Sequence, residues 1–259
     1  MERYGGGVGD PSWGHRLVRE RTVLRAVVGS RAQGLATEAS DTDLRGVYLP
    51  VTSDFWGLTR PPAQVEGPGP EQFSWELERC CVLALAGNPA VTEFLYSPLL
   101  EALTPVGAEL RDLRGAFLSR RVSAGLVGMA DRQYAKALAL RSRGGPVRWK
   151  PVVHVLRSLA CGLRLLRTGR LEVDVGPDRA GLLSVGRGEL SWEQVECWRA
   201  RLLVEIAAAE ARTPLPAQPD TAVVQDFLVR ARRGAVPDPD QQSASDGVTN
   251  GGRADEPEN

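Results

Sequence analysis

The feature that most constrains this chain is an apolar run that ends in a Gly-Ser turn and is followed shortly by two aspartates. The run leads into Gly29 and Ser30, and Asp41 and Asp43 stand one residue apart in a segment whose pattern predicts a strand over residues 42–49. Side chains alternate between the faces of a strand, so Asp41 and Asp43 are expected on one face. Neighbouring carboxylates repel each other, and a hard cation such as Mg²⁺ or Mn²⁺ would offset that repulsion.

Gly29 and Ser30 stand where the apolar run ends and a short helical turn is expected to begin. Backbone N–H groups at such a turn, together with the Ser30 hydroxyl, suit phosphate. Ser30 can equally cap the helix, because capping and phosphate binding use the same geometry. An Asp-x-Asp pair alone is often only a solvated strand edge. A phosphate-binding turn beside paired carboxylates favours chemistry on a nucleoside triphosphate instead.

This combination resembles the signature of the DNA polymerase β-type nucleotidyltransferase superfamily, in which Gly-Ser is followed by Asp-x-Asp on the next strand. Residues 29–34 and 40–50 are similar to one branch, the predicted nucleotidyltransferases associated with phage RNA-ligase and RNA-repair genes. Residues 73–98, which contain Gly-Asn-Pro-x-Val-x-Glu, and residues 150–157 support the same branch. The resemblance covers about residues 20–232.

The resemblance implies a role for each residue of the signature. In the superfamily, two aspartates hold two divalent metal ions, which assigns Asp41 and Asp43 here to Mg²⁺ or Mn²⁺. A hydroxyl attacks the α-phosphate of the nucleotide, and pyrophosphate leaves. Gly29 and Ser30 would hold the β- and γ-phosphates.

The resemblance also implies a third carboxylate, from a neighbouring strand. Glu71 stands at that place, one methylene longer than the expected Asp. The residues at every second position from Glu71 mix polar and apolar side chains, so the pattern does not establish a strand there. Glu76 is therefore a competing candidate for the third carboxylate, and Glu66 is a weaker one. Two further departures from the branch are Gln33, where an aromatic residue is common, and Met129, where a Tyr is common.

Five basic side chains are candidates for contacts with the nucleotide: Arg31, Arg45, Lys150, His154 and Arg157. Arg45 lies one pleat beyond Asp43, where it can touch the triphosphate or form a structural salt bridge. The last three lie on one side of a predicted helix. They can contact phosphates or the acceptor across a cleft between domains, or His154 can be a satisfied residue of the domain interface.

The predicted fold class is α+β: an α/β nucleotidyltransferase domain with a small mixed sheet over residues 1–105, followed by an all-helical domain over residues 106–234. Within the second domain, residues 150–167 give the clearest amphipathic pattern, and Gly169 is the expected cap. Residues 235–259 are poor in apolar side chains and are predicted to be a disordered tail.

Composition limits the partners. The chain has 32 Lys and Arg against 32 Asp and Glu, so its net charge is zero and no global basic field attracts nucleic acid. RNA binding would therefore need a local basic patch. Lys136 and Lys150 are the only lysines. The sequence shows no signal peptide and no long apolar span, and the four cysteines form no Cys-x-x-Cys pair, which favours a cytoplasmic protein with no membrane partner.

The predicted function is a metal-dependent transfer of NMP from an NTP to a hydroxyl acceptor, with release of pyrophosphate. RNA is the favoured acceptor through the resemblance, and a small molecule, as in antibiotic adenylyltransferases, is another. The competing hypothesis is a catalytically inactive module of the same fold that binds nucleotide or a regulatory partner. The sequence does not indicate the base preference or the oligomeric state.

Overall fold

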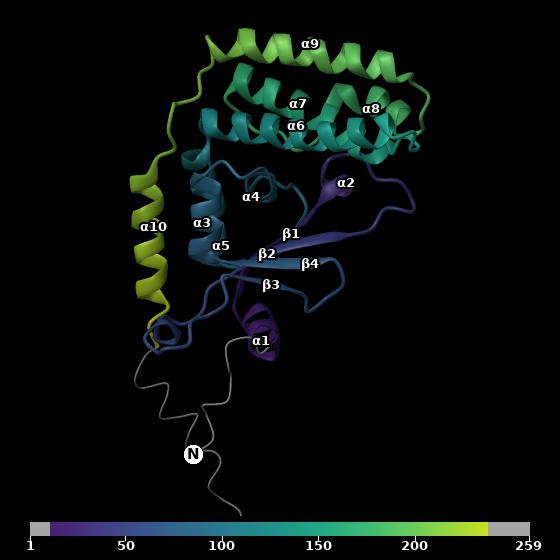
Figure 1. Ribbon diagram of the computed structural model, residues 1–259. Coiled ribbons are helices and arrows are strands. Elements are labelled where there is room, and N and C mark those ends of the chain that lie inside the picture. Colours follow the sequence, from purple (N-terminus) through teal and green to yellow (C-terminus); the bar gives the residue numbers. More distant parts are fainter. Residues whose placement is uncertain (1–10, 238–259) are drawn as a thin grey trace, which may run out of the picture.

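The computed structural model describes residues 11–237 and has an α+β architecture, with a mixed sheet below a layer of long helices (Figure 1). The sheet order is β3-β4-β2-β1-β5. β1 is antiparallel to β2 and β5, β4 is parallel to β2, and β3 is antiparallel to β4. The strands are β1 (Thr22–Val28), β2 (Asp43–Tyr48), β3 (Gln64–Glu66), β4 (Gln72–Glu76) and β5 (Leu100–Leu103).

Helices account for most of the remaining chain. The α-helices are α1 (Pro11–Arg21), α2 (Gly29–Ala32), α3 (Leu77–Leu85), α4 (Pro89–Leu95), α5 (Pro105–Asp112), α6 (Arg120–Ser142), α7 (Trp149–Thr168), α8 (Arg179–Gly186), α9 (Trp192–Glu210) and α10 (Thr221–Gly234). Three short 3-10 helices are η1 (Thr52–Phe55), η2 (Leu113–Phe117) and η3 (Gly176–Asp178).

The sheet is covered on both faces. One face carries buried residues such as Leu24, Val47 and Trp75, which share a core with α3, α4, α5 and α10. On the other face Tyr48 packs with Leu17 of α1. Consecutive residues of β2 therefore face different cores, as the two-residue period of a strand requires. Asp43 and Arg45 are in phase with Val47, so they belong to the face that carries the larger core.

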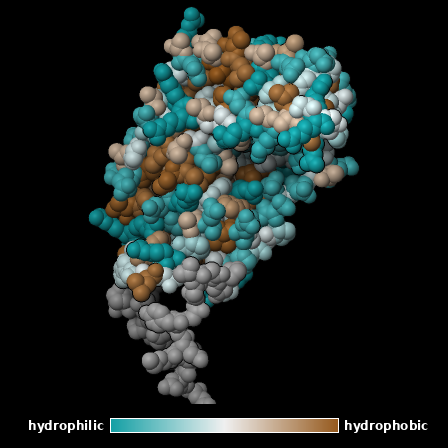
Figure 2. Space-filling view, viewed as in Figure 1, coloured by the Kyte–Doolittle hydropathy of each residue, from teal (hydrophilic) through white to brown (hydrophobic). Residues whose placement is uncertain are grey.

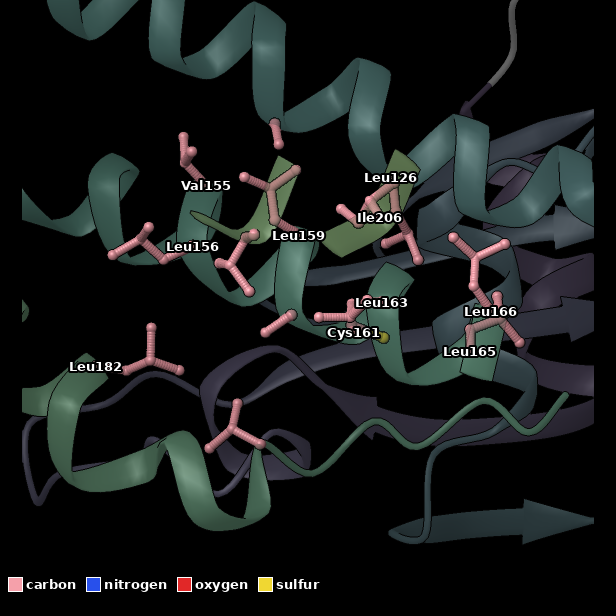
Figure 3. Packing of buried hydrophobic residues seen from close by; sticks show 14 of the residues in the cluster. Leu126, Val155, Leu156, Leu159, Cys161, Leu163, Leu165, Leu166, Leu182 and Ile206 are labelled. Carbon is pink, nitrogen blue, oxygen red and sulfur yellow. The ribbon is translucent and has the colours of Figure 1, made fainter. Parts of the chain in front are cut away.

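The long helices form a second core around α7 (Figure 3). Leu156, Leu159 and Leu165 of α7 are fully buried, and Leu126 of α6 and Ile206 of α9 pack in the same cluster. α7 is apolar on most of its circumference because α6, α8 and α9 all pack against it. Its end follows the predicted pattern, since Gly169 has a left-handed φ of 69°.

The last helix returns from the helical layer to the sheet side of the molecule, where α10 runs beside α3 (Figure 1). Val224 and Phe227 of α10 are buried in the core that the sheet shares with α3, α4 and α5. Arg232 donates a hydrogen bond of 2.7 Å to Glu76, which also accepts from the first N–H groups of α3. Burial raises the pKa of Glu76 although Arg232 lowers it, so desolvation is the larger effect.

Polar side chains cover much of the surface, and the apolar ones gather in separate patches on the face shown in Figure 2. This pattern agrees with helices whose apolar stripes are turned inward. Within residues 11–237, none of the helices combines the length and the apolar character needed to cross a bilayer. Residues 238–259, most of the predicted tail, lie outside the described part of the chain.

The Glu76–Arg232 pair gives a prediction about stability. Arg232→Met leaves the buried Glu76 carboxylate without its cation, and we expect the free energy of unfolding to fall by about 3 kcal/mol. Arg230→Met is the matched control on the same helix, because its ion pair with Glu109 is exposed and is expected to contribute less than about 1 kcal/mol. Denaturant unfolding would measure both, and equal losses would contradict the role given to the buried pair.

Candidate nucleotidyltransferase site

The predicted phosphate-binding turn lies directly against Asp43. β1 ends at Val28, which pairs with Asp43 across the antiparallel ladder. Gly29 follows with a φ of +68°, and a Cβ atom there would lie only 2.5 Å from Oδ2 of Asp43. A glycine is therefore required both by the backbone conformation and by the close approach of the carboxylate. The strand pairing brings the two halves of the sequence signature into contact.

The turn continues as the single-turn helix α2. The first N–H groups of any helix have no acceptor within the helix, so those of α2 are free to bind another group. The partly exposed Ser30 hydroxyl makes no hydrogen bond within the described residues. This turn therefore offers several unused hydrogen-bond donors beside Asp43.

Asp41 lies in the extended segment just before β2, which begins at Asp43. Arg31, on α2, holds this segment by hydrogen bonds to the carbonyl oxygens of Ser40 at 2.9 Å and Asp41 at 3.3 Å. The Arg31 guanidinium therefore links the turn to the segment that carries Asp41. The side chain of Asp41 is exposed.

Glu71 lies next to Asp43 through the parallel pairing of β2 with β4. Leu44 pairs with Gln72, and Glu71 directly precedes that pair. Glu71 has a φ of +51°, and its carbonyl oxygen accepts hydrogen bonds from the N–H of Leu44 and from Arg45. Arg45 also approaches Asp43 at 3.8 Å. In this geometry Arg45 braces the turn at Glu71 and lies close to the Asp43 carboxylate.

The two alternatives to Glu71 have other positions. Glu76 stands at the far end of β4, where it pairs with Tyr48, caps α3 and binds Arg232. Glu66 lies on the edge strand β3 and is exposed. Of the three candidates, only Glu71 lies beside Asp43 in the sheet register.

The carboxylates around the turn determine whether a divalent cation can bind there. Within residues 11–237, no three His, Cys, Asp or Glu side chains are gathered closely enough to hold a metal ion by themselves. Asp41, Asp43 and Glu71 therefore do not form a three-carboxylate cage. Mg²⁺, however, is usually held by one or two carboxylates together with substrate phosphates and water. Asp41 and Asp43 beside a phosphate-binding turn fit that mode of binding.

Glu93 of α4 connects the turn to the helical layer. Its carboxylate accepts a hydrogen bond from Gln33 at 3.2 Å and one from Arg157 of α7 at 2.9 Å. The Arg157 and Glu93 side chains are only 4% and 12% exposed, so the ion pair is buried. Arg157, one of the predicted nucleotide ligands, is thus engaged in this pair, and Glu93 braces the loop after the turn.

A second brace lies on the other side of the same turn, and the sequence did not indicate it. The segment after α7 contacts Gly34, where a Cβ atom would lie 2.5 Å from Oδ2 of Asp174. Arg179 of α8 donates to the carbonyl oxygen of Gly34 at 2.7 Å, and Val175 donates to that of Gln33 at 3.0 Å. The turn is therefore fixed to the helical layer from two sides.

His154 and Lys150 lie on α7, one helical turn apart, and both line a pocket between α6 and α7. The pKa of His154 is lowered by burial and by the positive charges of Arg157 and Lys150, while Glu93 and Asp43 act in the opposite direction. Among the charges that act on the His154 pKa, those of Glu93 and Asp43 therefore oppose the effect of burial. The side chain of Lys150 is exposed and makes no ion pair or hydrogen bond within the described residues.

A small mixed sheet whose Gly-Ser turn packs against a strand aspartate, followed by a helical layer, defines a polymerase β-type nucleotidyltransferase fold. The sequence profile described as "RNA repair pathway DNA polymerase beta family" matches residues 14–230, and the chain belongs to this family. The branch inferred from the sequence is therefore confirmed. A curated relative is the "Uncharacterized protein YcgL" of Bacillus subtilis (strain 168), 31% identical over 140 residues. The match covers 51% of this chain and 52% of that protein, about half of each.

The lowered pKa of His154 predicts a pH dependence of stability. Below the ordinary histidine value of 6.5, the unfolded chain takes up a proton that the folded protein resists. The contribution of His154 to stability is therefore complete above that pH and is lost as the pH falls, until the folded histidine is protonated. We expect His154→Gln to reduce the slope of unfolding free energy against pH just below 6.5. An unchanged slope would show that His154 does not resist protonation.

The Glu93–Arg157 pair gives a second stability prediction. Glu93→Gln leaves a buried guanidinium without its counter-charge, and we expect a loss of about 3 kcal/mol in unfolding free energy. Glu205→Gln is the control, because Glu205 pairs with an exposed arginine and should matter by less than about 1 kcal/mol. Adding Arg157→Met to Glu93→Gln should recover part of the loss. A double variant as unstable as the sum of the single variants would rule out direct coupling.

Proposed function

We propose that this protein is a metal-dependent nucleotidyltransferase that transfers NMP from an NTP to a hydroxyl acceptor. The observation that carries the proposal is the close approach of the Asp43 carboxylate to the Gly29 turn. A Cβ atom at position 29 would lie only 2.5 Å from Oδ2 of Asp43. A phosphate bound at this turn would be repelled by the neighbouring Asp43 carboxylate, because both groups are negatively charged. A cation between the two would offset that repulsion.

Asp41 and Asp43 would hold Mg²⁺ or Mn²⁺, with phosphate oxygens and water completing the coordination. When bound, the metal would supply Lewis-acid stabilisation of charge on the phosphate oxygens. Glu71 is the proposed third carboxylate, on the basis of its position beside Asp43 in the register of β2 and β4. Arg31 would act as a positioning residue, because it fixes the backbone of Asp41 rather than its carboxylate.

The remaining residues would place the triphosphate. The N–H groups of α2 and the Ser30 hydroxyl would bind the β- and γ-phosphates, and Arg45 would share its charge between Asp43 and the nucleotide. Lys150 and His154, on α7, would lie on the side of the site where the acceptor binds. In the transfer, the acceptor oxygen bonds to the α-phosphorus, the bond from that phosphorus to the β-phosphate oxygen breaks, and pyrophosphate leaves. The acceptor's proton passes to solvent or to a carboxylate of the site.

RNA is the proposed acceptor. This proposal is supported by the description of the family as part of an RNA repair pathway. The zero net charge of the chain requires that RNA be recognised by a local cluster of cations.

A second candidate is a nucleotide-binding module that transfers nothing. It is favoured by one observation, that Asp41, Asp43 and Glu71 do not gather into a three-carboxylate cluster within the described residues. Both candidates bind nucleotide, so turnover is the measurement that separates them. A loss of turnover in Glu71→Gln as large as that in Asp43→Asn would make Glu71 a working metal ligand.

Asp43→Asn and Asp41→Asn test the transferase directly. We expect each to reduce Mg²⁺- or Mn²⁺-dependent pyrophosphate release from NTPs at least about a hundredfold, because each removes a negatively charged ligand. Release would be measured for each of the four NTPs, with and without added RNA.

Asp226→Asn is the matched control, since Asp226 is exposed on α10 and distant in the fold from the turn. It should release pyrophosphate at the wild-type rate. Full activity in Asp43→Asn would overturn the metal assignment. Nucleotide binding without release from any NTP, with RNA present, would favour the second candidate.

A further inference from the structure

A pocket of about 460 Å³ opens between α6 and the start of α7. Its apolar wall is formed by Ala137, Leu140 and Pro151. The polar residues that line it are Gln133, Lys136, Arg148, Lys150 and His154. A pocket of this size is typical of small-molecule sites and can hold one nucleotide unit.

The cations of the pocket have no counter-charge. No carboxylate is among its lining residues. Lys136, Arg148 and Lys150 make no ion pair or hydrogen bond within residues 11–237. Several arginines of the same helical layer, in contrast, are paired with carboxylates, such as Arg164 with Asp178 and Arg199 with Asp131. Three converging cations without partners favour an anionic ligand.

Both lysines of the chain line this pocket, although the other thirty basic residues counted with them are arginines (32 Lys and Arg in all, less two). Lysine presents a compact charge on a flexible stem and binds phosphate as a point charge. The placement of Lys136 on α6 and Lys150 on α7 sets one such charge on each wall.

Gln133 gives the pocket a second requirement, a hydrogen-bond donor on the ligand. Its amide oxygen is buried at the pocket and has no hydrogen-bond partner. A buried acceptor without a donor costs free energy, which a ligand N–H or O–H would recover. An amino group of a base or a ribose hydroxyl can supply that donor, whereas a bare phosphate ion cannot fill both this position and the apolar wall.

The pocket also lies next to the proposed catalytic site. His154 lines it and lies one helical turn from Arg157 on α7, and Arg157 is joined through Glu93 to Gln33, which follows the Gly29 turn. A nucleic-acid strand with one nucleotide in the pocket would therefore place an adjoining nucleotide close to the Gly29 turn.

We propose that this pocket is the acceptor subsite and binds one phosphorylated nucleoside unit of a single-stranded RNA. Lys136, Arg148 and Lys150 contact its phosphate, Gln133 accepts from its base or ribose, and the apolar wall packs against its ring. The proposal rests on the proposed transferase function, of which it names the acceptor site. The incoming NTP carries the same phosphate chemistry, so the experiment must separate the two sources.

The test is binding of a 5′-phosphorylated, fluorescein-labelled oligoadenylate, followed by fluorescence anisotropy in EDTA so that turnover plays no part. We expect Lys136→Gln and Arg148→Gln each to weaken binding by roughly tenfold, the equivalent of one charge-assisted hydrogen bond. The slope of log affinity against log salt should fall by about 0.7 for each lost contact. Lys136→Arg should retain most of the affinity.

Arg143→Gln is the matched control. Arg143 is exposed, adjoins the same end of α6 and carries the same charge, but does not line the pocket. It should bind oligoadenylate like the wild type. If Arg143→Gln lost as much affinity as Lys136→Gln, the oligoadenylate would be held only by general attraction to a charged surface, and the proposal would be overturned.

A parallel titration with ATP and Mg²⁺ distinguishes the acceptor from the incoming nucleotide. The expected result is that Lys136→Gln leaves ATP affinity within about twofold while oligoadenylate affinity falls. Weaker ATP binding with unchanged oligoadenylate binding would overturn the acceptor assignment, and so would no oligoadenylate binding by the wild type. Oligoadenylate binding at the pocket without pyrophosphate release would instead contradict the transferase proposal alone.

Discussion

The buried ion pair between Glu93 and Arg157 is the interaction on which the site depends. Glu93 receives hydrogen bonds from Arg157 of α7 and from Gln33, which follows the Gly29–Ser30 turn. Such a pair contributes little net stability, because desolvation offsets much of the attraction, but it strongly penalises arrangements in which either partner is unpaired. Its main effect is therefore to fix one geometry, in which the turn, α4 and α7 meet.

That geometry explains why a turn as short as α2 can be positioned for chemistry. A one-turn helix has little stability of its own. Here it is fixed at its start by the close approach of Asp43 to Gly29 and at its end by contacts of Gln33 and Gly34 with the segment after α7. The sheet supplies the carboxylates and the helical layer supplies the anchor, so the site needs both parts of the molecule.

The sequence predicted the elements whose signals are local. β1, β2 and the cap at Gly169 follow from periodicity and from local backbone preference, and the structure has them where the pattern indicated. The edge strands β3 and β5 give no comparable signal, because they are short and pair on one side only. The return of α10 to the sheet, with Phe227 in its core, depends on long-range packing that no local pattern reveals.

The same distinction applies within the site, and α7 shows it most clearly. Lys150, His154 and Arg157 were recognised as neighbours because they are spaced by one helical turn. Their environments then separate them: Arg157 is buried on Glu93, His154 is half-buried at the pocket wall, and Lys150 is exposed at the same pocket. On one side of α7, Arg157 is therefore an anchor, His154 is a half-buried group, and Lys150 is an exposed cation without an ion pair within the described residues. Because the three share one rigid element, anchoring Arg157 also sets the positions of the other two.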